Sequence, residues 1–204
     1  MSFSLERTNN KVKADIGRLR QILDDMPMTA NSRYALAEIV LIRASAVFED
    51  ALAEIAYKLA CGAEFRNGRS ENLSAVHRSR ISARIAMLCD GGAKATPANY
   101  LKWTKAKYIG QSVKGVLDPN GPYITITRRF GQEIAEIFAV RNHAAHRNSS
   151  SRTGYMLWVK QQYGQERRLR LGYFLLTTNL RPTSNIQRYL TQILVITDDL
   201  VAGD

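Results

Sequence analysis

The segment SRYALAEIVLIRASAVFEDALAEIAYKLACG, residues 32–62, constrains the fold more than any other part of the chain. Its apolar residues recur every three or four positions, the spacing that places side chains on one face of an α-helix. Gly62 ends the pattern, as glycine commonly does after a helix. A helix of this length predicts a protein built mainly from packed helices, with this one as its spine. The residues expected to face the core are Ala37, Val40, Leu41, Ala44, Phe48, Ala51, Leu52, Ile55 and Leu59.

Shorter stretches with the same spacing predict further helices. The first ends at the PMTAN stretch of residues 27–31, and a later one has Ile81 and Ile85 on its apolar side. Thr96 followed by Pro97 is typical of a helix start, because proline is tolerated at the first helical position. The predicted helices cover residues 10–26, 71–89, 97–110, 129–146 and 185–201.

Residues 155–178 depart from this helical pattern. YMLWVKQQ and RRLRLGYFLLTTNL are rich in aromatic and branched residues and are separated by YGQE, while the preceding NSSSRTG reads as a loop. Two such runs around a short turn are typical of a β-hairpin. We therefore expect a mainly α fold, a helical bundle with a β-hairpin inserted before the last helix. Its 204 residues suit one domain, residues 1–204.

The chain is strongly basic, with 29 Lys and Arg against 18 Asp and Glu, a net charge of +11. Such an excess favours a polyanionic partner, either nucleic acid or an anionic membrane surface. Basic and aromatic side chains together suit single-stranded nucleic acid. The candidates for phosphate contact include Lys102, Lys105, Lys107, Arg147 and Arg152, and those for base stacking are Trp103, Tyr108 and Tyr155.

The cysteines and the apolar segments indicate a cytoplasmic, soluble protein. Cys61 and Cys89 are the only cysteines, show no CxxC spacing and follow no secretory apolar segment. We expect reduced thiols, with neither a disulfide framework nor a structural zinc site. Arg43 interrupts the longest apolar run, and no window reaches the roughly 20 apolar residues that span a bilayer.

The stretch RNHAAHR, residues 141–147, ends the predicted helix 129–146. At about 100° per residue, Arg141 falls near the centre of the stripe formed by Phe130, Ile134 and Phe138. A desolvated guanidinium needs a carboxylate, a subunit interface or a phosphate beside it. Glu49 and Asp50 of the long helix either neutralise Arg141 or are simply solvated.

The motif also contains Asn142, His143 and His146, and two of these share a face: Asn142 and His146, four residues apart. Arg141 and His146 stand five residues apart, roughly 140° around a regular helix. One regular helix therefore does not direct both groups at a single atom. Either the helix unwinds near Ala145, or two copies of the motif face each other across a homodimer.

RNHAAH at 141–146 resembles the Rx4-6H signature of HEPN (higher eukaryotes and prokaryotes nucleotide-binding) domains, and VRNHAAHR is similar to the form seen in the RiboL-PSP type. LIRASAVFEDALAEI, residues 41–55, resembles the aromatic- and acid-containing helix that precedes the motif there. The resemblance covers about 30–148 and the last helix. It implies a metal-independent endoribonuclease acting as a dimer, in toxin–antitoxin or phage-defence settings, without a cofactor and restrained by an antitoxin or another regulatory partner.

The chemistry of RNA cleavage suits these residue types. RNA supplies its own nucleophile, the 2′-hydroxyl, so the protein needs a proton acceptor and donor and a cation over the phosphate. His146 suits the first task and Arg141 the second, while Asn142 orients the histidine or holds a phosphate oxygen. His143 is a supporting residue. The expected products carry 2′,3′-cyclic phosphate and 5′-hydroxyl ends.

Three other interpretations remain open. Arg141 would be a structural ion-pair partner, with Asn142 and His146 capping the helix, in a non-catalytic nucleic-acid-binding or assembly module. A nucleotide sensor would use the same basic surface. A metal site built from His143, His146 and Glu136 lacks a further ligand and is the weakest of the three.

Overall fold

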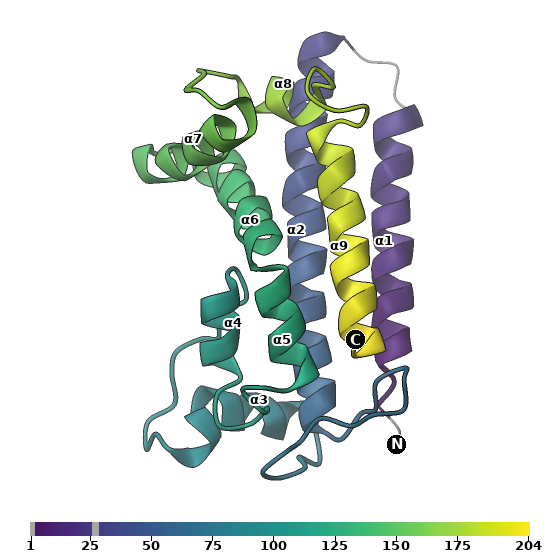
Figure 1. The fold of residues 1–204 in the computed structure, drawn as a ribbon, viewed down its shortest axis with the longest axis vertical. Coiled ribbons are helices and arrows are strands. Elements are labelled where there is room, and N and C mark those ends of the chain that lie inside the picture. Colours follow the sequence, from purple (N-terminus) through teal and green to yellow (C-terminus); the bar gives the residue numbers. More distant parts are fainter. Residues whose placement is uncertain (1–2, 26–28) are drawn as a thin grey trace.

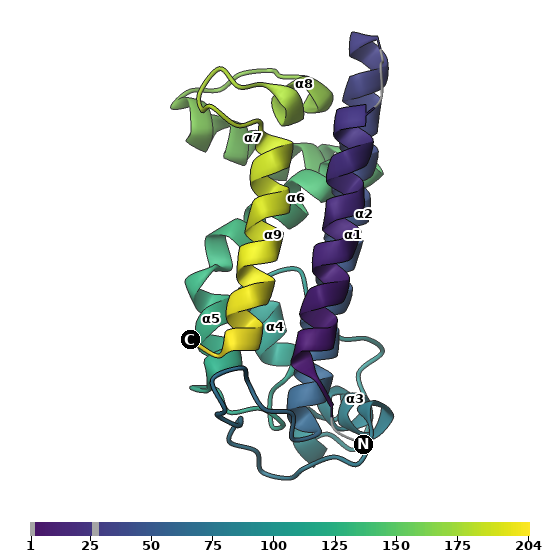
Figure 2. The same cartoon turned by 90° about the vertical axis from the view of Figure 1, so that its right-hand side faces the viewer.

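The computed structural model describes residues 3–25 and 29–204 and has an up-and-down helical bundle at its centre. The bundle contains α1 (Leu5–Asp25), α2 (Ala30–Ala60), α9 (Asn185–Ala202) and a fourth column, in which α5 (Pro122–Arg129) continues into α6 (Gly131–His146). In Figure 1 these columns run alternately up and down, and Figure 2 shows α1 beside α2 with α9 next to them. The mainly α, bundled fold is confirmed.

The long helix α2 is the spine of this bundle, as its sequence predicted. It contacts α1, α6, α8 and α9. Every residue expected to face the core from α2 is buried, and Phe48 stacks on Phe138 of α6 with 6.0 Å between ring centroids. Burying an aromatic side chain of this kind contributes about 1.5–3 kcal/mol to the free energy of unfolding. This packing fixes α6 against the spine.

The other α-helices lie at the two ends of the bundle or beside its fourth column (Figure 1). α3 (Arg80–Leu88) lies at one end, α7 (Ser149–Tyr163) and α8 (Leu171–Leu176) lie at the other, and α4 (Ala106–Ser112) packs beside α5 and the start of α6. Within residues 3–25 and 29–204, no helix is both long enough and apolar enough to cross a membrane.

The predicted β-hairpin at 155–178 is wrong: the described part of the chain contains no β-strand, and this region forms α7 and α8. The predicted loop NSSSRTG is wrong too, because Asn148 caps α7 by accepting a hydrogen bond from the Ser151 N–H at 2.8 Å. Tyr155 and Val159 are buried four residues apart, a helical spacing that the aromatic and branched composition concealed. Gly164 then ends α7 in the left-handed conformation (φ 69°).

Two predicted helices are shorter than expected. The helix predicted over 71–89 begins only at Arg80, because Ser79 and Ser82 form a reciprocal capping box there. Ile81 and Ile85 are exposed, contrary to prediction, while Ala83 and Met87 face the core. The helix predicted over 97–110 begins only at Ala106, as α4.

The first and last helices agree better with the sequence. α1 begins at Leu5, five residues earlier than predicted, because Leu5 itself is buried. The predicted end of this helix at Met26, with Pro27 and Met28 of the PMTAN stretch, lies outside the described residues. α9 covers Asn185–Ala202, against the predicted 185–201.

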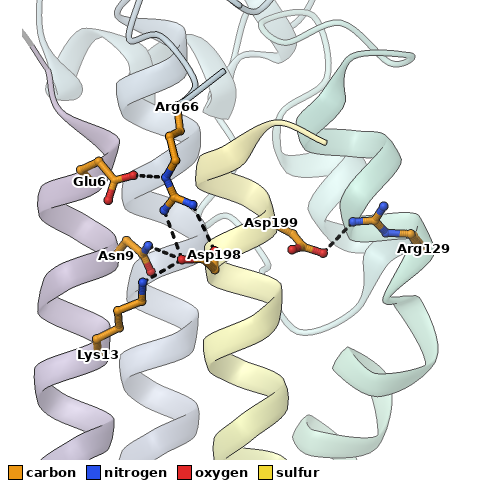
Figure 3. Close-up of polar contacts among 7 residues, drawn as sticks. All are labelled: Glu6, Asn9, Lys13, Arg66, Arg129, Asp198 and Asp199. Carbon is orange, nitrogen blue, oxygen red and sulfur yellow. Dashed lines mark hydrogen bonds and ion pairs between the residues drawn. The ribbon is translucent and has the colours of Figure 1, made fainter. Parts of the chain in front are cut away.

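A network of charged residues fastens α1 and the loop after α2 to α9 (Figure 3). Asp198 of α9 accepts hydrogen bonds from Asn9 at 2.7 Å, from Lys13 at 2.8 Å and from both terminal nitrogens of Arg66 at 3.1 Å. Glu6 of α1 accepts a further hydrogen bond from Arg66. The hydrogen bonds from Arg66, Lys13 and Asn9 hold the pKa of Asp198 well below its usual range.

A second ion pair joins α9 to the column that carries the motif. Arg129, in the last turn of α5, donates to Asp199 at 2.7 Å (Figure 3). Because α6 begins two residues later, this pair helps to set where α6 starts.

Candidate active site

A buried polar cluster around Glu136 positions α6 beneath the motif. Glu136 accepts hydrogen bonds from Gln162 of α7 at 2.6 Å and from the Tyr189 hydroxyl of α9 at 2.8 Å, and it pairs with Arg188 of α9. The side chains of Glu136 and Arg188 are only 9% and 15% exposed. Burial and the neighbouring carboxylate raise the pKa of Tyr189 well above its usual value. The cluster therefore joins three helices through one carboxylate.

Arg141 lies one turn and a half beyond Glu136, partly buried between α6 and α2. One of its terminal nitrogens donates to Glu49 of α2 at 3.3 Å, and the other donates to the Asn142 side chain at 3.1 Å. Its guanidinium also lies over the ring of Phe138, 5.9 Å from the centroid. Its side chain is 23% exposed, and its buried Nε has no hydrogen-bond partner among the described residues. Arg141 thus keeps unused donor capacity beside an accessible edge.

The two acidic residues proposed to accompany Arg141 behave differently. Glu49 is in contact with it, and its side chain is 31% exposed, so the ion pair is open to water on one side. Asp50 is exposed and lines a groove between α1 and α2 instead. An ion pair this accessible contributes little to stability and can be exchanged for another anion.

His146 ends α6 and is exposed. Its imidazole forms no hydrogen bond to any side chain or backbone group within residues 3–25 and 29–204. The helix does not unwind near Ala145: α6 continues to His146, and Arg147 then takes the left-handed conformation (φ 48°) as its C-cap. Arg141 and His146 of one chain consequently point in directions about 140° apart.

His143 faces the interior of the chain. Its ring stacks on Tyr155 of α7, with 4.9 Å between centroids, and its Nδ1 lies 3.4 Å from the Ser151 hydroxyl. Burial lowers the pKa of His143, and the positive charges of Arg147 and Arg152 lower it further. The neutral ring that results suits a packing role between α6 and α7 better than proton transfer near neutrality.

The proposed phosphate-contacting residues divide into two groups. Arg147 is the last residue of the RNHAAHR stretch and is paired with Glu38 of α2, and Arg152 follows in α7. Lys107 lies in α4, and Lys102 and Lys105 lie just before it. α4 packs beside the first residue of α6, because a Cβ on Gly131 would meet Ala106 at 3.3 Å. Arg141 stands ten residues further along, about 15 Å on a straight helix.

Two of the proposed base-stacking residues are not available. Trp103 is 5% exposed and packs edge-to-face on Tyr57, and Tyr155 is 1% exposed beneath His143. Both predictions are therefore wrong, because large aromatic side chains in this fold serve the core first. Tyr108 keeps a partly exposed ring.

The described residues contain no group of three or more His, Cys, Asp and Glu side chains that could hold a metal ion. Both oxygens of Glu136, the third member of the metal site considered from the sequence, are occupied by Gln162, Arg188 and Tyr189. What the end of α6 does offer is a cation with spare donors, an amide and an accessible imidazole. These are the groups needed to bind a phosphodiester and to transfer protons from the attacking hydroxyl and to the leaving oxygen.

Comparisons of the chain with protein-family models, with curated proteins and with solved structures find no match.

Proposed function

We propose that this protein is a metal-independent endoribonuclease of HEPN type, a single-domain bundle whose site lies at the carboxyl end of α6. The observation that carries the proposal is Arg141, which is mostly buried, has spare donors and shares a short helical segment with the accessible imidazole of His146. We take its natural setting to be the cytoplasm, as a toxin or phage-defence effector restrained by an antitoxin or another regulatory partner.

In the proposed reaction His146 removes the proton from a 2′-hydroxyl, whose oxygen attacks the adjacent phosphorus. The bond from phosphorus to the 5′-oxygen breaks, and a protonated imidazole returns a proton to the leaving oxygen. Arg141 exchanges Glu49 for the phosphate and stabilises the charge that develops on its oxygens, while Asn142 holds the guanidinium in place. The products are a 2′,3′-cyclic phosphate and a 5′-hydroxyl.

The unbroken helix through His146 supports a site assembled from two subunits. Because Arg141 and His146 of one chain diverge by about 140°, a single copy does not present both to one phosphate. A symmetric homodimer would bring each arginine to its partner's histidine.

Subunit mixing tests this arrangement. Arg141→Ala and His146→Ala should each be inactive alone. Denatured together in equal amounts and refolded, they should recover roughly a quarter of wild-type RNA cleavage, because half of the dimers are mixed and each has one complete site. The assay is cleavage of single-stranded RNA in EDTA, with size-exclusion chromatography to measure the dimer and co-purification of differently tagged subunits to measure the mixed dimer. Inactive mixtures that still form mixed dimers would refute the shared site.

A non-catalytic nucleic-acid-binding module is the second candidate, and the ion pair between Arg141 and Glu49 favours it. That pair gives the guanidinium a partner without any ligand. In this case the wild type, Arg141→Ala and His146→Ala would all leave RNA uncut. The affinity for RNA would depend only on salt and on the basic surface.

A further inference from the structure

Two tyrosines and three lysines form a basic aromatic surface at α4, at the opposite end of α6 from the motif. We define this platform as Tyr100, Lys102, Lys105, Lys107 and Tyr108. Tyr100 is 60% exposed, and the three lysines are exposed. The Lys102 ammonium lies 5.2 Å from the ring centroid of Tyr100 and 5.3 Å from that of Tyr108, so one cation reaches both rings. Lys105 lies 5.8 Å from the Tyr108 ring.

The backbone beneath the platform is held in a defined position. Lys102 donates its N–H to the buried hydroxyl of Ser112 at 2.8 Å, and the same hydroxyl donates to the Lys102 carbonyl at 3.0 Å. The next residue, Trp103, is buried against Tyr57 with 6.0 Å between ring centroids. This anchoring explains why α4 starts late, and it leaves neighbouring side chains pointing outward on a fixed loop.

Among the residues that the structure describes, the platform lysines have no acidic partners. Within residues 3–25 and 29–204, no Asp or Glu oxygen lies within ion-pair distance of Lys102, Lys105 or Lys107, although twelve ion pairs occur elsewhere in the described chain. Instead, two of the ammonium groups rest on tyrosine rings. Lys102 and Lys105 lie at the same tyrosine ring, and this concentration of positive charge attracts a polyanion.

We infer that the platform binds a single strand of RNA, with bases stacked on Tyr100 and Tyr108 and the lysines moved from the rings to the phosphates. Alternating cations and accessible rings match the alternating phosphates and bases of an unpaired strand. A duplex hides the faces of its bases, and an acidic peptide would satisfy the lysines without using the rings. The inference deepens the proposed function: it names unpaired RNA as the substrate and rests on that function for the choice of RNA.

The position of the platform fits a role in holding substrate beside the site. α4 packs at the start of α6, whereas Arg141 lies about 15 Å further along the same helix. A strand that is held at α4 and runs along α6 would place a phosphate a few nucleotides away at Arg141. The platform would then set where cleavage occurs relative to an unpaired segment.

Binding to a short fluorescent single-stranded deoxyoligonucleotide tests the inference independently of cleavage, because such a strand lacks the 2′-hydroxyl. Tyr100→Leu and Tyr108→Leu should each weaken binding at least about fivefold, measured by fluorescence anisotropy. Lys102→Ala should reduce the slope of log affinity against log salt by about 0.7. Tyr173→Leu and Lys160→Ala, at the opposite end of the bundle, are the matched controls and should bind as wild type does.

The wild type should also bind this strand more tightly than a duplex of the same sequence. Equal affinity for both, no measurable binding by the wild type, or wild-type affinity in both tyrosine variants would overturn the inference. Cleavage of RNA without any effect of the tyrosines would leave the nuclease standing and remove the platform. Binding that depends on the tyrosines, by a protein that cuts no RNA, would support the platform and remove the nuclease.

Discussion

Replacing His146 by alanine should lower the rate of RNA cleavage by roughly 100- to 10,000-fold, the usual effect of losing a general acid or base. The side chain is exposed and makes no hydrogen bond within the described chain, so the thermal unfolding midpoint should stay unchanged. Single-turnover cleavage of a labelled single-stranded RNA in EDTA measures the rate. A large loss of rate without a loss of stability would identify a chemical role for the imidazole.

The chain provides a matched control in His77. This histidine lies before α3, and its backbone N–H donates to the Ala60 carbonyl at 2.9 Å. His77→Ala should cleave RNA at the wild-type rate, whereas Arg141→Ala should lose about 100- to 1,000-fold through the missing cation. Equal activity in His146→Ala and the wild type would remove His146 from the site.

The second large effect concerns the buried cluster under the motif. Glu136→Leu should lower the free energy of unfolding by about 3–5 kcal/mol, because the change leaves the charge of Arg188 buried without its carboxylate. Gln162 and the Tyr189 hydroxyl lose their acceptor in the same step. Urea denaturation followed by circular dichroism measures the loss.

A double variant separates the buried charge from simple packing. Glu136→Leu combined with Arg188→Met replaces the ion pair by apolar side chains and should recover most of the lost stability. A double variant less stable than Glu136→Leu alone would show that Arg188 stabilises the fold by contacts other than this pair.

Much of the bundle follows from local sequence patterns. The apolar residues of α2 recur so regularly that nine of its core residues follow from the sequence, and all nine are buried, although Ala56 and Ala60 belong to the same buried face and do not follow from the pattern. The region 155–178 could not be assigned in this way. Its aromatic composition is typical of strands. Tertiary packing nevertheless buries pairs of residues four positions apart, and the Asn148 cap starts a helix before them, so the region is helical.

The candidate site could be predicted in part. The sequence leaves open whether Glu49 pairs with Arg141 or is solvated, and in the structure the two side chains form an ion pair. The cluster of Glu136 with Arg188 was missed, because its members stand 52 residues apart and nothing local links them. Trp103 and Tyr155 were misassigned as stacking residues, since exposure depends on neighbours such as Tyr57 and His143 that only the fold brings together.

We propose that RNA is cut through its own 2′-hydroxyl at the end of α6. The most direct measurement is analysis of the fragment ends after the wild-type protein has acted in EDTA on a single-stranded RNA and on the same sequence in deoxy form. We expect cleavage of the RNA alone, with 2′,3′-cyclic phosphate and 5′-hydroxyl ends. Intact RNA, cleavage of the deoxy strand, or fragments with 5′-phosphate ends would contradict it.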